Sequence, residues 1–117
     1  MFETISAIIV TVSNMKASTA FYRDTLGISI KFESPDWTEF ITEGTTLALH
    51  STTDQRKAQP GGVSFGFRVN NIDEVYDLLQ ARGVQFVMPP TKQDFGAKLA
   101  VFLDPDGHSI SMSDYQA

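Results

Sequence analysis

The architecture of this chain can be read from VSNMKASTAFYRDTLGI, residues 12–28, because a stretch of the same design follows half a chain later. That second stretch is VNNIDEVYDLLQARGV, residues 69–84. Each one begins at the end of an alternating apolar strand, passes an asparagine, runs for about three helical turns and stops at a glycine. The asparagines, Asn14 and Asn71, are 57 residues apart in a chain of 117. The sequence therefore predicts two copies of one supersecondary unit.

Each copy is predicted to be a strand, a helix and three further strands. In the first copy we expect strands near residues 7–12, 28–33, 37–42 and 46–51, with a helix over roughly residues 16–26. In the second copy we expect strands near residues 64–69, 84–88, 98–103 and 108–113, with a helix over residues 72–82. Asn71 is expected to cap this helix, and Glu74 lies at the spacing of a capping box.

The polar segment at residues 52–62 is expected to link the two copies. We therefore expect residues 1–117 to form one domain, with a first module at about 1–51 and a second at about 63–117. Alternation along the strands places larger apolar side chains on one face, toward the helices, and smaller or more polar ones on the other. The smaller side chains either line a ligand cavity or form an ordinary solvated face.

Composition excludes several classes of protein. Acidic residues outnumber basic ones 14 to 9, a net charge of −5, which is a poor match to a phosphate backbone and weakly favours a cationic ligand. The absence of cysteine excludes disulfides, thiolate nucleophiles and iron–sulfur clusters. The longest apolar run, residues 7–10, is far shorter than the roughly 20 residues that cross a bilayer. We expect a cytoplasmic protein that binds neither nucleic acid nor membrane.

Residues 12–27, 65–73 and 102–108, the last reading FLDPDGH, resemble three stretches of the vicinal oxygen chelate superfamily. That superfamily holds glyoxalases, extradiol dioxygenases, fosfomycin-resistance enzymes and bleomycin-resistance binding proteins. The resemblance covers nearly the whole chain. It implies an α+β fold in which two tandem βαβββ modules form a curved mixed sheet around a cavity, with the helices on the outer face. Because the superfamily spans several chemistries and plain binding, the resemblance alone does not fix the activity.

The resemblance also implies four metal-ligand positions, each occupied by His or Glu in the metal enzymes of the superfamily. In this chain they fall on Ala7, Ala48, Ser64 and Ser111. None of the four offers the imidazole or carboxylate that divalent metals prefer. We therefore expect no metal and no cofactor, which argues against the metal-dependent lyase, dioxygenase and transferase chemistries of the superfamily.

Seven side chains are candidates for contact with a small molecule: Trp37, His50, Ser64, Arg68, Phe95, Ser109 and Ser111. Trp37 would stack on a planar ligand, or else cover the core or a dimer interface. Arg68 would grip an anionic group, or else pair with an acid at the mouth of the cavity. Phe95 lies beside a glycine in a loop, where it would act as a lid or simply anchor the loop.

The first hypothesis is a metal-free binding protein of the bleomycin-resistance type, which sequesters a drug or metabolite, cationic by the charge argument, and works as a homodimer. The alternative is a glyoxalase-like lyase or another enzyme with a non-standard or metal-independent site. In the metal-independent form, Arg68 would hold an anionic substrate and His50 would act as general base.

Overall fold

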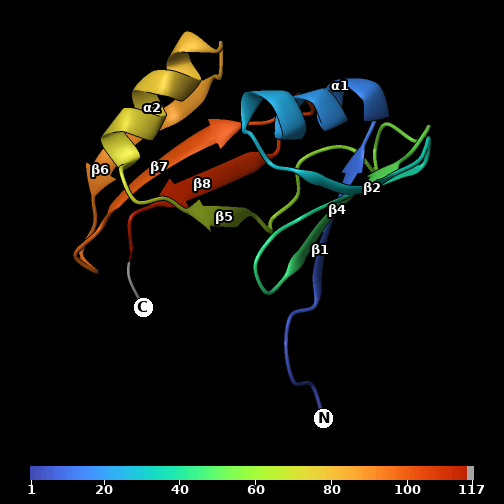
Figure 1. Ribbon diagram of the computed structural model, residues 1–117, viewed down its shortest axis with the longest axis horizontal. Coiled ribbons are helices and arrows are strands. Elements are labelled where there is room, and N and C mark those ends of the chain that lie inside the picture. The colour runs from blue at the N-terminus through green and yellow to red at the C-terminus, as the bar shows by residue number, and fades with distance from the viewer. Residues whose placement is uncertain (116–117) are drawn as a thin grey trace. The chain divides into compact units, whose positions relative to one another are not determined.

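The computed structural model describes residues 1–115, which form two compact units divided between Gln59 and Pro60. Each unit has one four-stranded mixed sheet and one helical segment, in the order strand, helix and three strands. The two copies that the repeat predicts are therefore present, and the α+β fold of two βαβββ units is confirmed (Figure 1).

The first unit contains four strands and two consecutive helical turns. These elements are β1 (Ala7–Val12), α1 (Met15–Ala20), η1 (Phe21–Thr25), β2 (Ile30–Glu33), β3 (Trp37–Phe40) and β4 (Thr46–Ser51). The strand order across the sheet is β1-β4-β3-β2. β1 runs parallel to β4, whereas β4, β3 and β2 are joined by antiparallel pairing.

The second unit repeats this topology. Its elements are β5 (Phe65–Arg68), α2 (Ile72–Ala81), β6 (Phe86–Lys92), β7 (Lys98–Leu103) and β8 (Ser109–Ser113). The strand order is β5-β8-β7-β6, with β5 parallel to β8 and the other pairs antiparallel. β6 extends beyond its predicted end at residue 88, through Pro89 and Pro90. An edge strand tolerates prolines, and two register shifts interrupt the pairing of β6 with β7.

The first helix differs from the continuous α-helix predicted over residues 16–26. Asn14 accepts a hydrogen bond from the backbone N–H of Ala17 at 3.0 Å, so the start is capped through its side chain. After Ala20 the chain forms a π-helical turn over Phe21–Thr25. Tyr22, in this turn, is fully buried, with its ring 5.7 Å from that of Phe40. The wider turn thus contains one of the large side chains that are fully buried in the core.

The side-chain cap that the sequence predicts at the start of the second helix does not form. Asn71 occupies the N-cap position, but its side chain makes no capping hydrogen bond. Asp73 and Glu74 lie in the first turn, where negative charge is favoured by the helix dipole. Asp73 accepts a hydrogen bond from Lys98 Nζ at 2.8 Å, which raises the pKa of Lys98 and joins α2 to β7.

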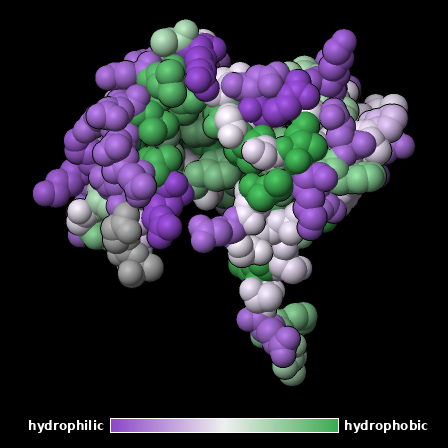
Figure 2. All heavy atoms as spheres, in the orientation of Figure 1, coloured by the Kyte–Doolittle hydropathy of each residue, from purple (hydrophilic) through white to green (hydrophobic). Residues whose placement is uncertain are grey.

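Each sheet has one face buried against its own helix and one face that we call the open face. Thr38 contacts Thr19 of α1, with their hydroxyl oxygens 3.2 Å apart, so the even-numbered positions of β3 face the helix. The predicted alternation holds on β1, where Val10 and Val12 are buried and Ile9 is 54% exposed. The N-terminal segment before β1 extends from the unit, and its hydrophobic side chains are exposed (Figure 2).

The cores of the two units are separate sets of apolar side chains. The larger members in the first unit are Val10, Val12, Tyr22, Phe40, Leu47 and Leu49. Those in the second unit are Ile72, Leu79, Phe102, Ile110 and Met112.

We predict that Ser18→Ala stabilises the protein by about 1 kcal/mol, because the Ser18 hydroxyl is fully buried and has no hydrogen-bond partner among residues 1–115. The measurement is denaturant unfolding, read as a higher midpoint with an unchanged slope. Thr19→Val is the matched control. It removes a buried hydroxyl that contacts Thr38 and should lower the midpoint. A Ser18→Ala protein less stable than the parent contradicts the prediction.

We also predict that Gly66→Ala destabilises the protein by about 1–3 kcal/mol. A Cβ on Gly66 would overlap the Ser111 hydroxyl and lie 3.1 Å from the Ser111 carbonyl oxygen. Adding Ser111→Ala should recover part of the loss, because it removes the overlapping oxygen. Gly61→Ala is the control, since a Cβ there meets nothing within 4 Å. Equal unfolding midpoints for Gly66→Ala and Gly61→Ala would disprove this steric account.

Candidate functional site

On the open face of the first sheet, two predicted site residues lie side by side. His50 on β4 is paired with Trp37 on β3 and with Thr11 on β1. Paired residues on neighbouring strands share a face, so all three side chains lie on the side away from Thr38 and α1. The rings of Trp37 and His50 are 5.9 Å apart, with an angle of 59° between their planes. The structure thus places these two candidates in direct contact.

Glu39 completes this group and was not among the predicted site residues. The indole Nε1–H of Trp37 donates a hydrogen bond to Glu39 Oε1 at 3.0 Å. Glu39 and Trp37 are half-buried, whereas His50 is exposed. We call Trp37, Glu39 and His50 the Trp37 cluster. The signal for Glu39 in the sequence is its spacing of two residues from Trp37 on the same strand, which places both on one face.

The positions where the resemblance implies metal ligands do not fit a divalent metal. Ala7 on β1 and Ala48 on β4 carry methyl groups, and Ala48 is completely buried between its partners Ile9 and Glu39. In the second unit, Ser64 comes one residue before β5, and Ser111 on β8 is paired with Gly66. Alanine has no donor atom, and a neutral hydroxyl is a weak ligand compared with imidazole or carboxylate.

The part of the chain from residue 1 to 115 also brings together no three His, Cys, Asp or Glu side chains that could hold a metal ion. No step through a metal is therefore derived from these residues.

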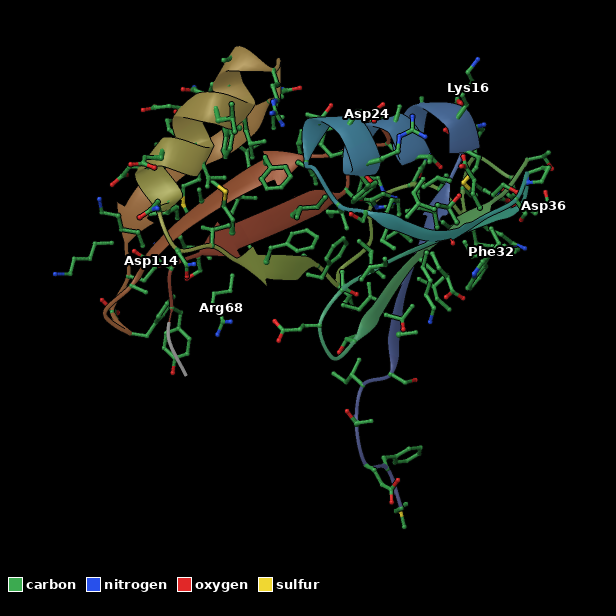
Figure 3. All side chains as sticks on the ribbon, viewed as in Figure 1. Lys16, Asp24, Phe32, Asp36, Arg68 and Asp114 are labelled. Carbon is green, nitrogen blue, oxygen red and sulfur yellow. The ribbon has the colours of Figure 1, made fainter. Side chains whose placement is uncertain are left out.

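The open face of the second sheet carries polar candidates. Arg68 is paired with Ser113, Gly66 with Ser111, and Leu103 with Ser109. Arg68 is exposed and projects to the side of the sheet away from α2 (Figure 3). Its guanidinium forms no ion pair with any residue in the described range 1–115. This face therefore offers one cationic group beside a row of hydroxyls.

Phe95 lies in the loop between β6 and β7 and is 53% exposed. Its ring packs edge-on against Tyr115, with centroids 5.5 Å apart and planes at 79°. Tyr115 follows β8, and its backbone N–H donates to the hydroxyl of Ser113, the partner of Arg68. The loop is therefore anchored by an aromatic contact, and a lid function for Phe95 remains a prediction. Tyr115 was not singled out from the sequence.

Two open clefts in the first unit are lined by residues outside the Trp37 cluster. One, of about 650 Å³, is lined mainly by polar residues at the carboxyl ends of β1 and β4, including Asn14, Asp36 and Thr52. The other, of about 610 Å³, lies between α1 and β2 and is lined in part by Lys16, Arg23 and Glu33. Neither cleft is lined by a predicted site residue.

The cationic side chain of Arg23 in the second cleft is already engaged. Its guanidinium donates two hydrogen bonds to the carboxylate of Asp24, at 2.7 and 2.9 Å. This pairing raises the pKa of Arg23 and lowers the pKa of Asp24. Both side chains are exposed, so water screens the pair and it adds little to stability.

No helix within residues 1–115 is long and apolar enough to cross a bilayer.

Known proteins resemble this chain in sequence and in the arrangement of its helices and strands. The metallothiol transferase FosB of Staphylococcus saprophyticus is 28% identical over 116 residues, which cover 96% of this chain and 77% of that protein. A glyoxalase-related enzyme from Fulvimarina pelagi superposes with a TM-score of 0.82 at 20% identity, over 96% of this chain and 88% of the other. A superfamily member from Sphaerobacter thermophilus gives a TM-score of 0.77 at 25% identity, over 96% and 97% of the two chains.

The sequence profile of the Glyoxalase/Bleomycin resistance protein/Dioxygenase superfamily matches residues 4–112, almost the full length of the chain. The matched range includes both βαβββ units. The chain belongs to the glyoxalase/bleomycin resistance protein/dioxygenase superfamily.

Proposed function

We propose that this protein binds a small organic molecule without a metal ion, in the manner of the bleomycin-resistance members of its superfamily. The observation that carries the proposal is the open face of the first sheet. There the two implied metal-ligand positions are Ala7 and Ala48, while the adjacent strand β3 supplies an aromatic ring with a fixed polar partner. A face of this kind suits stacking and hydrogen bonding better than metal coordination.

The ligand contacts follow from this proposal. In the first unit Trp37 would stack on the ligand and His50 would make a polar contact. On the second unit, a small molecule would find polar contacts at Arg68, Ser64, Ser109 and Ser111, and an apolar contact at Phe95. No claim about catalysis is needed, because sequestering a drug or metabolite requires only affinity.

We further propose that the protein is a cytoplasmic homodimer. Three large apolar side chains of the first unit support pairing of two copies. Ile9 is 54% exposed, Phe32 is 54% exposed, and Ile41 is 61% exposed. Ile9 and Phe32 belong to one row of paired residues across the open face. Exposed apolar groups that gather on one face are typical of surfaces that bind another protein or a ligand.

The similarity to FosB favours a second candidate function, that of a thiol transferase. That relative is a metallothiol transferase, and the match covers 96% of this chain. An enzyme of this kind here would need ligands other than Ala7, Ala48, Ser64 and Ser111. A metal-independent enzyme that uses His50 and Arg68 is the other catalytic possibility.

Metal content separates these candidates. We expect less than about a tenth of an equivalent of divalent metal in protein purified without chelator and without a nickel column, because alanine and serine are poor ligands. The measurement is elemental analysis of the purified protein. Close to one equivalent per chain, reduced in a His50→Ala variant, would contradict the proposal and favour the transferase.

Binding is tested with a screen of drugs and metabolites by thermal unfolding. A ligand at a hundred times its dissociation constant should stabilise the protein by about 2.7 kcal/mol, and it should change the fluorescence of Trp37, the single tryptophan. Mass spectrometry should then show that the mass of the compound is unchanged after incubation with the protein. Recovery of a modified compound would show an enzyme, and a broad screen without any stabilising compound would count against a small-molecule binder.

A further inference from the structure

We infer that Glu39 makes the Trp37 cluster selective for planar ligands that carry a positive charge; this inference rests on the proposed small-molecule binding function. The two parts of the recognition are the face of the Trp37 indole and the carboxylate held at its edge.

The open face of the first sheet carries one carboxylate, that of Glu39 on β3. The resemblance implies a carboxylate on the neighbouring strand β4 instead. Glu39 on β3 is paired directly with Ala48 on β4. The resemblance places a carboxylate at position 48, where this chain has a buried methyl group. Neighbouring strands lie about 4.8 Å apart. The carboxylate is therefore displaced by one strand, toward the indole of Trp37.

Hydrogen bonding fixes the Glu39 carboxylate and leaves part of it available. Oε1 accepts the indole N–H of Trp37 at 3.0 Å. Oε2 accepts no hydrogen bond from any residue in the described part of the chain. A ligand cation stacked on the indole would gain from the electron-rich ring face and from the carboxylate beside it. Such a ligand would supply the counter-charge that Glu39 lacks within residues 1–115.

The rest of the open face strengthens this selectivity. The other residues that the register places there are Ala7, Ile9, Thr11, Phe32, Trp37, Thr46, Ala48 and His50. None of these is a lysine or arginine, and His50 is the only other titratable side chain among them. Lys31 lies in the register shift between Ile30 and Phe32, so the pairing assigns it to neither face, and it forms no ion pair with Glu39. Ile9 and Phe32 are large apolar groups in the same row as Glu39. Apolar neighbours exclude water when a ligand binds and so strengthen the attraction between opposite charges.

The test uses two probes with the same ring system, the N-methylquinolinium cation and neutral quinoline at pH 8. The single indole N–H of Trp37 gives one resonance in a ¹⁵N-correlated spectrum, which reports on this cluster directly. We expect the cation to shift this resonance saturably and to bind at least tenfold more tightly than quinoline. Glu39→Gln keeps an oxygen that can accept the indole N–H, and it should reduce the affinity for the cation at least fivefold. Its affinity for quinoline should stay within twofold.

The matched control is Glu43→Gln, which removes one negative charge from the turn between β3 and β4 and should leave both affinities within twofold. Equal affinity for the two probes, or a Glu39→Gln protein that retains the full preference for the cation, overturns the inference. If neither probe moves the indole resonance, the inference is also overturned. The proposed binding function is decided separately by the compound screen.

Discussion

Parallel pairing of the first and last strands of each unit is the constraint on which the rest of the structure depends. β1 pairs with β4, and β5 pairs with β8, in the same direction. Parallel neighbours cannot be joined by a short hairpin, so the chain must cross over between them. In each unit the crossover contains the helix, followed by two antiparallel strands. The helix covers one face of its sheet and leaves the other face open (Figure 1).

The strand register then determines which side chains can act together. On β3 the even position Thr38 is tied to α1, so Trp37 and Glu39 must face away from the helix. The pairing of β3 with β4 places His50 opposite Trp37 and Ala48 opposite Glu39. No local motif connects these residues, since β3 and β4 are separated by a turn. The Trp37 cluster is therefore a product of topology and register.

The order of elements in each unit could be predicted from the sequence, because the repeat, the alternation along the strands and the glycines that end the helices agree. Gly27 and Gly83, at which the two predicted helices end, both adopt the positive φ that this position requires. Three details could not be predicted. The π turn at Phe21–Thr25 contains the buried Tyr22, whose packing is set by the rest of the unit. Asn71 occupies the N-cap position, but its side chain makes no capping hydrogen bond. β6 continues through two prolines because it lies at an edge of its sheet. The spacing places Trp37 and Glu39 on one face of the strand, but the sequence does not show which face of the sheet is open, so Glu39 was not among the predicted site residues.

Superfamily membership and the residues at the implied ligand positions lead to different expectations about chemistry. FosB is 28% identical to this chain over 116 residues, but metal coordination depends on a few donor atoms at fixed places. Glu39 does not restore the implied carboxylate at position 48. One strand spacing, about 4.8 Å, is more than twice a zinc–oxygen bond of about 2.1 Å. A carboxylate moved by that distance, and bonded to an indole N–H, is better placed to meet a charged group on an organic ligand stacked on the same indole.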